Sequence, residues 1–337
     1  MSSEESGGQN GRAPKNLKGL LRFCMEATRS EDAPNSSEIM EPMSEDRRKW
    51  LEEALTSMSV NPVERMNSCV KAIQEAVSDT EEGTEQQIMA VSELQDWGED
   101  LDIAGDFIKI NGLCIVPKLL SSEVSELRWR CLELLGNLSQ NNPVAQTALL
   151  TLKLLPVFLH MIDSDPNPTV QIKALYAVSC LVRNNSDAQT QLLAHDGLPV
   201  LLCALHSEEE KLRVKATFMI SSICSSNPAL KDSLVEVGVV EKLVTLLKGE
   251  EHGHTHEHIL SALLTIVTDH VVAWNKCCSG EMGLKTFLTQ RIQFLEGKEQ
   301  FKEEKEYAEQ LLQVLNTKPD KPNPTTRSSS SQLMLAI

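Results

Sequence analysis

The stretch HGHTHEH contains four histidines, His252, His254, His256 and His258. Imidazole is a common zinc ligand, and two histidines four residues apart, such as His254 and His258, lie on one face of a helix. A tetrahedral site needs further ligands, and the chain has neither an HExxH motif nor a CxxC pair. We therefore expect a histidine-rich loop that leads into a helix and holds no metal.

Cys277 and Cys278 are adjacent and could form a redox switch. Nearby positive charge favours the reactive thiolate, and the neighbouring sequence supplies only Lys276. The chain also lacks a GxGxxG motif, a P-loop, a GxSxG motif and a paired-carboxylate arrangement. These observations predict a protein that is not an enzyme and uses no cofactor.

The chain is acidic, with 48 Asp and Glu residues against 32 Lys and Arg residues and a formal net charge of −16. Proteins that bind nucleic acid gather basic side chains into a patch, so nucleic acid is not the expected partner. The scattered cysteines indicate a reducing compartment, and the start of the chain lacks the apolar core of a signal peptide. The longest apolar run is short and contains Lys153, so we expect a soluble cytoplasmic protein that enters no membrane.

The sequence pattern divides the chain into three parts. Residues 1–60 predict a flexible segment with two amphipathic helices, residues 61–317 are patterned for helices almost throughout, and residues 318–337 predict a disordered Pro- and Ser-rich tail. The predicted fold class is all-α. The apolar faces of the first two helices are formed by Leu17, Leu20, Leu21 and Cys24 and by Trp50, Leu51, Ala54, Leu55 and Met58.

Acidic residues gather in one part of the helical region. Eleven of them, and no basic residue, lie between Glu75 and Asp106. A solvated outer face is the simplest interpretation, and attraction of a basic partner surface is the alternative.

Three stretches within residues 61–317 repeat one pattern: LRWRCLELLGNLSQNNPVAQTALL, VQIKALYAVSCLVRNNSDAQTQLL and LRVKATFMISSICSSNPALKDSLV. A glycine break precedes a second helix at Gly112, Gly197 and Gly238, and Leu155 takes that place in another copy. A period of about 42 residues with this helix pattern is typical of armadillo or HEAT repeats. Such repeats stack into a solenoid with a concave groove, so we predict an armadillo-like helical repeat solenoid.

The long helix of each repeat carries a second strip beside its core residues, which in the first copy are Leu127, Cys131, Leu134, Leu135 and Leu138. Basic residues recur at one position of this strip, and an acidic or aromatic residue follows three positions later. We predict that this strip binds a partner, and surface residues without a role are the alternative. Its predicted members are Arg130, Glu133, Lys173, Tyr176, Lys215, Phe218 and His258.

Several motifs, taken together and in order, resemble the armadillo-type Hsp70 nucleotide exchange factor family. They lie between Asn16 and Thr317 and read KNLKGLLRFCMEA, EPMSEDRRKWLEEAL, IAGDFIKINGL, LRWRCLELLGNLSQN, KALYAVSCLVR, HEHILSALLTIVTD and GLKTFLTQR. The resemblance implies a co-chaperone that binds the nucleotide-binding domain of Hsp70 through the concave armadillo groove and opens the cleft that holds ADP. It further implies that the N-terminal segment contacts the chaperone's substrate-binding domain and promotes client release.

The resemblance also implies two binding positions, a small residue at Ala104 and a basic residue at Lys215. The family's glycine-rich N-terminal tract is reduced here to Gly7, Gly8 and Gly11. We expect the protein to act as a monomer.

The alternative function is a generic armadillo adaptor that binds linear peptides of another partner. Such grooves hold an extended peptide with a repeated Trp and Asn ladder. The corresponding pairs here are Glu133 and Asn137, Tyr176 and Cys180, and Phe218 and Ser222. These residue types disfavour the adaptor.

Overall fold

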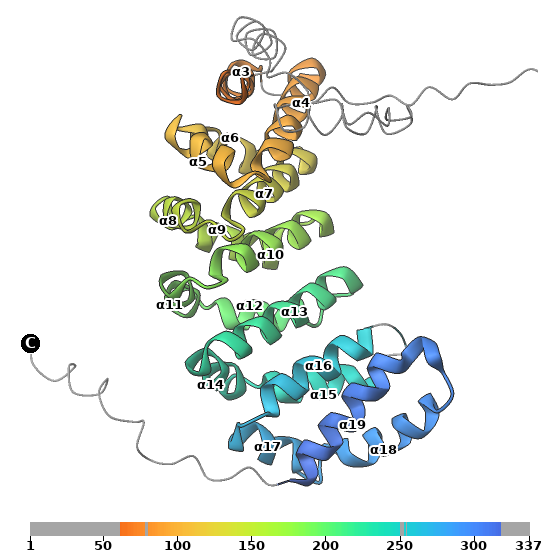
Figure 1. The fold of residues 1–337 in the computed structure, drawn as a ribbon. Coiled ribbons are helices and arrows are strands. Elements are labelled where there is room, and N and C mark those ends of the chain that lie inside the picture. The colour runs from red at the N-terminus through yellow and green to blue at the C-terminus, as the bar shows by residue number, and fades with distance from the viewer. Residues whose placement is uncertain (1–60, 78–79, 250–252, 254, 318–337) are drawn as a thin grey trace, which may run out of the picture. The chain divides into compact units, whose positions relative to one another are not determined.

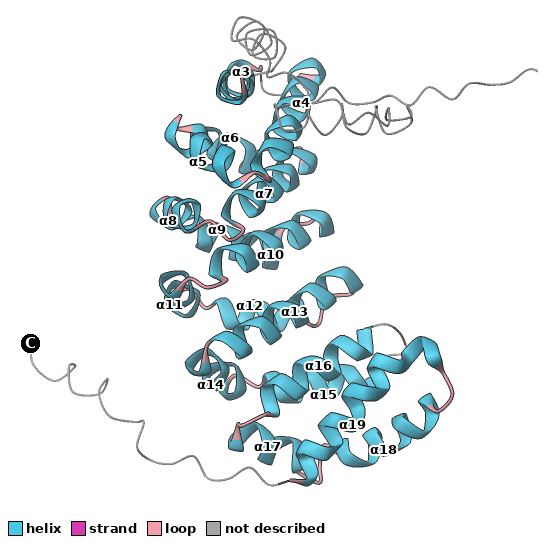
Figure 2. Ribbon diagram, viewed as in Figure 1, coloured by secondary structure: helices cyan, strands magenta, loops and turns pink. Residues whose placement is uncertain are grey.

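The computed structural model describes residues 61–77, 80–249, 253 and 255–317, and the regular elements among them are all helices (Figure 2). The all-α prediction is therefore confirmed. The two helices predicted within residues 1–60 and the predicted tail at 318–337 lie outside the described residues. The chain forms two compact units, which divide after Ile115 and thus inside the predicted domain 61–317.

Unit 1 contains α3 (Pro62–Glu75), α4 (Glu81–Gly98), α5 (Leu101–Lys109) and the short 3₁₀ helix η2 (Gly112–Ile115). Polar side chains fix the helix starts, because Asn61, Thr80 and Asp100 each accept hydrogen bonds from backbone amides of the first turn. Helices α3 and α4 pack against each other and against α5. The buried apolar side chains include Met66, Ile73, Val91, Leu94 and Phe107.

Unit 2 stacks helices in groups of three, and the third helices of successive groups contact one another in the order α7, α10, α13, α16 and α19 (Figure 1). This arrangement confirms the predicted helical repeat. The elements are α6 (Val116–Leu120), α7 (Ser125–Ser139), α8 (Pro143–Thr151), α9 (Leu154–Ser164), α10 (Pro168–Val182), α11 (Ser186–Ala194), α12 (Gly197–Ala204), α13 (Glu210–Ser226), α14 (Pro228–Glu236), α15 (Val239–Gly249), α16 (Thr255–Val267), α17 (Val271–Cys278), α18 (Leu284–Leu295), η3 (Glu299–Phe301) and α19 (Lys302–Asn316).

The break before each second helix differs in detail from the predicted glycine. A left-handed residue stands there, and it is Asn111 (φ 60°), Lys153 (φ 55°), Asp196 (φ 54°), Gly238 (φ 97°) or Gly283 (φ 56°). The exceptional copy therefore breaks at Lys153 and not at Leu155, which lies inside α9. Gly197 follows the left-handed residue and is required for space, because a Cβ there would lie 2.3 Å from Leu192 Cδ1.

Polar side chains link successive repeats of unit 2 through what we call the polar ladder, formed by Gln146, Asn185, Gln189, Asn227 and Lys231, of which Gln146 and Gln189 are buried. Gln146 donates to the carbonyl oxygens of Cys180 (2.9 Å) and Arg183 (3.2 Å) and accepts from Asn185 Nδ2 (3.0 Å). One repeat later, Gln189 accepts from Asn227 Nδ2 at 2.8 Å. Lys231 occupies the next equivalent position, and its Nζ donates to the carbonyl oxygens of Thr265 and Thr268 at the end of α16.

Replacing Gln146 with Met should lower the free energy of unfolding by about 1–3 kcal/mol, because two carbonyls and one amide lose their partner. Gln146 is 3% exposed, so water cannot readily replace it. Thermal or urea unfolding measures the change. The matched control is Thr147→Ala at the next, exposed position of α8, which should stay within about 0.5 kcal/mol of the parent. Equal effects of the two substitutions would contradict a role for the polar ladder in stability.

No single helix among the described residues has the length and apolar composition needed to cross a membrane. Helices α8 and α9 have the required length and composition only when taken together, and the chain bends by 81° between them. In this structure α9 buries Leu155, Phe158 and Ile162.

Candidate partner-binding surface

The third helices of unit 2 present one continuous line of polar and aromatic side chains, which we call the aromatic–cation strip. Core spacing explains its position, because Leu127, Cys131 and Leu135 on α7 are buried while Glu133 is half-buried on another side of the helix. The strip contains Trp129, Arg130, Glu133, Lys173, Tyr176, Lys215, Phe218 and His258. Every one of these side chains lies in unit 2 and is at least partly exposed.

The first contact along the strip joins α7 to α10. Lys173 forms an ion pair with Glu133, and its Nζ lies 5.9 Å from the ring centroid of Trp129. Arg130 pairs instead with Glu126 one turn earlier (2.8 Å), and its guanidinium lies 4.5 Å from the Trp129 centroid. Both cations therefore already have a carboxylate neighbour and an aromatic neighbour, an arrangement that holds the Trp129 ring in place.

The second contact joins α10 to its neighbours on both sides. The Tyr176 hydroxyl donates to Asn137 Oδ1 on α7 at 3.0 Å, while Lys215 Nζ on α13 lies 5.8 Å from the Tyr176 ring centroid. The ring fits because α7 has Gly136 beneath it, where a Cβ would lie 2.4 Å from Tyr176 Cε1. Tyr176 is thus positioned by a hydrogen bond and by a glycine that makes room for its ring.

The third contact joins α13 to α16. The Phe218 and His258 rings have centroids 4.5 Å apart and planes tilted by 46°. Phe218 remains 54% exposed and therefore contributes apolar area to the strip. From α7 to α16, the aromatic ring on one helix is therefore met each time by a basic side chain or a histidine from the next.

Lys215 differs from the other cations of the strip. It is exposed, and within the described part of the chain it forms no ion pair; its Nζ lies over the Tyr176 ring. Arg130 and Lys173 are paired with carboxylates, and His258 Nδ1 lies 3.5 Å from Glu257. A carboxylate on a partner protein would therefore find an available charge at Lys215.

Two family models match the chain. The model of the SIL1/FES1/HPBP1 C-terminal domain matches residues 103–215 and 197–290, and that of the nucleotide exchange factor Fes1 matches residues 17–107. Hsp70-binding protein 1 of Homo sapiens is 36% identical over 318 residues, which cover 91% of this chain and 87% of the human protein. The chain belongs to the SIL1/FES1/HPBP1 family.

Further similarities agree with this placement. Hsp70-binding protein 1 of Mus musculus is 36% identical over 92% of this chain, and the Hsp70 nucleotide exchange factor FES1 of Coccidioides immitis is 32% identical over 34% of it. Among solved structures, a designed armadillo repeat protein superposes with a TM-score of 0.59 at 19% identity over 73% of this chain. A second one, solved in complex with the peptide (KR)4, gives a TM-score of 0.61. The predicted armadillo fold is therefore confirmed.

The predicted binding position Ala104 is not at the surface in this structure. Ala104 lies in α5 with no exposed surface, so it does not present its methyl group to a binding partner. Its apolar side chain belongs to the core stripe that also contains Phe107, three residues later on the same helix. Cys180, four residues after Tyr176 on α10, is also buried, so it is not part of the strip and Tyr176 is the exposed residue of this pair.

The residues that suggested metal or thiol chemistry show no such arrangement where they are described. The described residues contain no group of three or more His, Cys, Asp or Glu side chains able to hold a metal, while His252 and His254 lie outside the described part. His256 is buried and its backbone amide bonds to Gly253. Burial raises the pKa of the Cys277 thiol to about 12, so the reactive thiolate is disfavoured there.

Sequence reasoning missed Trp129 as a member of this surface and Gly136 as the buried residue that makes room for Tyr176. Trp129 precedes Arg130 by one residue and therefore falls outside the three-residue spacing that picked out Tyr176 and Phe218. Gly136 lies within the α7 helix pattern, where glycine costs helix stability, and this cost is the signal that could have drawn attention to it.

Proposed function

We propose that this protein is an Hsp70 co-chaperone, a nucleotide exchange factor that is not itself an enzyme. Its relatives are named Hsp70-binding protein 1 and Hsp70 nucleotide exchange factor FES1, and the model matching its first third is described as a nucleotide exchange factor. The observation that carries the proposal is this family match together with an exposed aromatic–cation strip on the repeats. Both favour a protein that acts by binding another protein.

In the proposed mechanism, the strip binds the nucleotide-binding domain of Hsp70. Lys215 supplies a charge for a carboxylate of the chaperone, and Phe218 supplies exposed apolar area next to it. Because the third helices of unit 2 are packed in one stack, they would act as a stiff surface against which one part of the chaperone domain is displaced. The displacement opens the ADP-binding cleft, so ADP release requires no covalent step by this protein.

The remaining parts of the proposal concern the rest of the chain. The segment 1–60 would contact the substrate-binding domain of Hsp70 and promote client release. The protein would act as a monomer in the cytoplasm, without binding nucleic acid or membrane. The acidic balance of the chain supports the exclusion of nucleic acid.

Release of a fluorescent ADP analogue from Hsp70 tests the proposal. The full chain should accelerate release when unlabelled nucleotide is added in excess, and Lys215→Ala should reduce this acceleration. A generic peptide-binding adaptor would instead bind without changing the rate of ADP release. Binding with an unchanged release rate would therefore contradict the exchange function, and absence of binding would contradict the choice of partner.

A further inference from the structure

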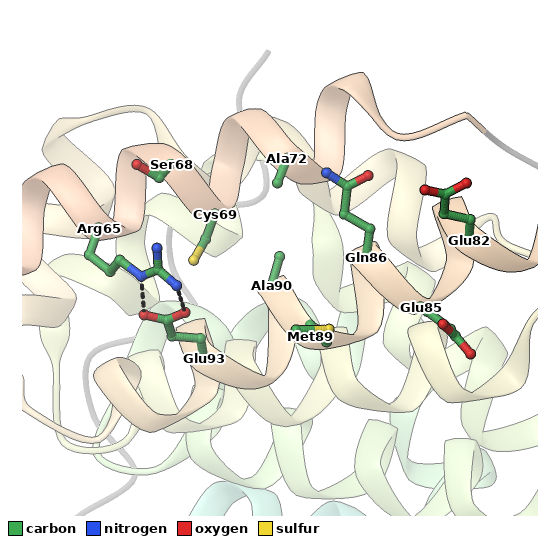
Figure 3. A pocket seen from close by; sticks show the side chains of 10 residues that line it. All are labelled: Arg65, Ser68, Cys69, Ala72, Glu82, Glu85, Gln86, Met89, Ala90 and Glu93. Atoms are coloured by element: carbon green, nitrogen blue, oxygen red, sulfur yellow. Dashed lines mark hydrogen bonds and ion pairs between the residues drawn. The ribbon is translucent and has the colours of Figure 1, made fainter. Parts of the chain in front are cut away.

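Unit 1 contains a groove that the proposed function does not use. It lies between α3 and α4, has a volume of about 490 Å³, and is shown in Figure 3. Small side chains of Cys69, Ala72 and Ala90 form part of its lining, and Met89 projects beside them with 73% of its surface exposed. Small residues let another helix approach closely, and an exposed Met is an adaptable apolar contact.

The charges around this groove are unequal. At one end Arg65 forms a two-pronged ion pair with Glu93, with Nε and Nη2 donating at 2.6 and 2.8 Å, so these charges neutralise each other. The pairing raises the pKa of Arg65 and lowers the pKa of Glu93. At the other end Glu82 and Glu85 are exposed and form no ion pair within the described residues. The groove thus combines an apolar floor with an acidic end.

A segment of this same chain has the complementary pattern. Residues 16–28, NLKGLLRFCMEAT, carry an apolar face of Leu17, Leu20, Leu21 and Cys24 when placed on a helix. Lys18 and Arg22 are four residues apart and flank one side of that face. From Leu17 to Cys24 this face is about 10 Å long on a helix. The part of α3 that lines the groove, from Arg65 to Ala72, has the same length.

The connection to the groove favours this segment over a separate partner. The residues that follow it run to Asn61, the N-cap of α3, and a linker of about thirty residues can span up to roughly 100 Å. Attachment at the groove itself makes docking intramolecular, with an effective concentration on the order of millimolar. In addition, a single family model covers residues 17–107, which include both the segment and the two groove helices.

We propose that residues 16–28 dock as an amphipathic helix in the α3–α4 groove of their own chain. The apolar face packs on Ala72, Met89 and Ala90, while Lys18 and Arg22 lie toward Glu82 and Glu85. Docking would keep this segment from other partners until one competes for it, which makes the groove a regulatory site. The inference does not depend on Hsp70, because it concerns the protein alone.

Hydrogen–deuterium exchange on the full-length protein tests the docking. Backbone amides of residues 17–24 should exchange at least about tenfold more slowly than an unstructured chain. Met89→Asp and Glu85→Lys should abolish this protection, and both positions are exposed, so unit 1 should remain folded. Glu99→Lys, an exposed charge reversal on the C-cap of α4 outside the groove, is the matched control and should leave the protection intact.

A charge exchange separates docking from a general effect on folding. Arg22→Glu should abolish protection, and combining it with Glu85→Lys should restore it, because the two reversed charges can pair again. Exchange of residues 17–24 at the unstructured rate in the parent would overturn the proposal, as would protection unaffected by the groove variants. Protection that rises with protein concentration would assign the groove to a second copy, and protection that appears only with added Hsp70 would assign the segment to the chaperone. Either result would also overturn it.

Discussion

Replacing Lys215 with Ala should weaken binding to Hsp70 by about 2 kcal/mol, or roughly thirtyfold, and slow the stimulated release of ADP. Lys215 is exposed, has no carboxylate partner in the described part of the chain, and is placed over the Tyr176 ring. The helix and its core do not depend on it, so the free energy of unfolding should change by about 0.5 kcal/mol or less. Binding can be measured by titration calorimetry, and folding by thermal melting.

Lys242→Ala is the matched control for this experiment. Lys242 is also an exposed lysine of unit 2, but it lies on α15, a second helix of its repeat, where its Nζ contacts His206 Nε2 at 3.3 Å. Its replacement should leave Hsp70 affinity unchanged. Equal losses in the two variants would mean that net charge, and not the aromatic–cation strip, governs binding. An unaffected Lys215→Ala protein would remove Lys215 from the proposed interface.

Ala104→Arg should destabilise the protein by roughly 3 kcal/mol or more, because a long charged side chain would be forced into a position with no exposed surface. Thermal or urea unfolding measures the loss. Any decrease in Hsp70 binding should follow the loss of folded protein, since the buried methyl group offers no contact of its own.

Gly105→Arg provides the control at the adjacent position. A Cβ at Gly105 would meet nothing within 4 Å, so the same side chain can point away from the core, and the gain in helix propensity should keep stability near that of the parent. If Ala104→Arg melted like the parent yet failed to bind Hsp70, the burial of Ala104 would be the wrong explanation and a direct contact at this position would be supported.

The fold could be predicted from sequence because its signals are local and repeated. Apolar residues at core spacing recur along the third helices, as the leucines of α7 show, and an Asn–Pro or Asn–Ser pair starts the first helix of three successive repeats, α8, α11 and α14. The basic positions of the strip followed from the same register. The left-handed conformation of Lys153 could not be predicted, because a non-glycine residue seldom adopts it.

The candidate surface depends on contacts between helices. Spacing along one helix placed Lys173 and Tyr176 on a common face, but it could not show that Glu133 pairs with Lys173 while Lys215 stays available. Nor could it show that Gly136 makes room for Tyr176. The burial of Ala104 was missed because a small residue fits the sequence pattern of a core and of a surface equally well.

The polar ladder also determines how unit 2 can come apart. Each of its links joins only neighbouring repeats, as between Asn227 and Gln189, and the series ends where Lys231 donates to the carbonyl oxygens of Thr265 and Thr268. We therefore expect unfolding of unit 2 to start at α19, after which the described residues contain no further repeat, and each additional repeat that unfolds adds a free-energy cost. We expect α10 and α13, which have a neighbouring third helix on both sides, to open later than α19, so Tyr176 and Lys215 should keep their positions when the C-terminal end opens.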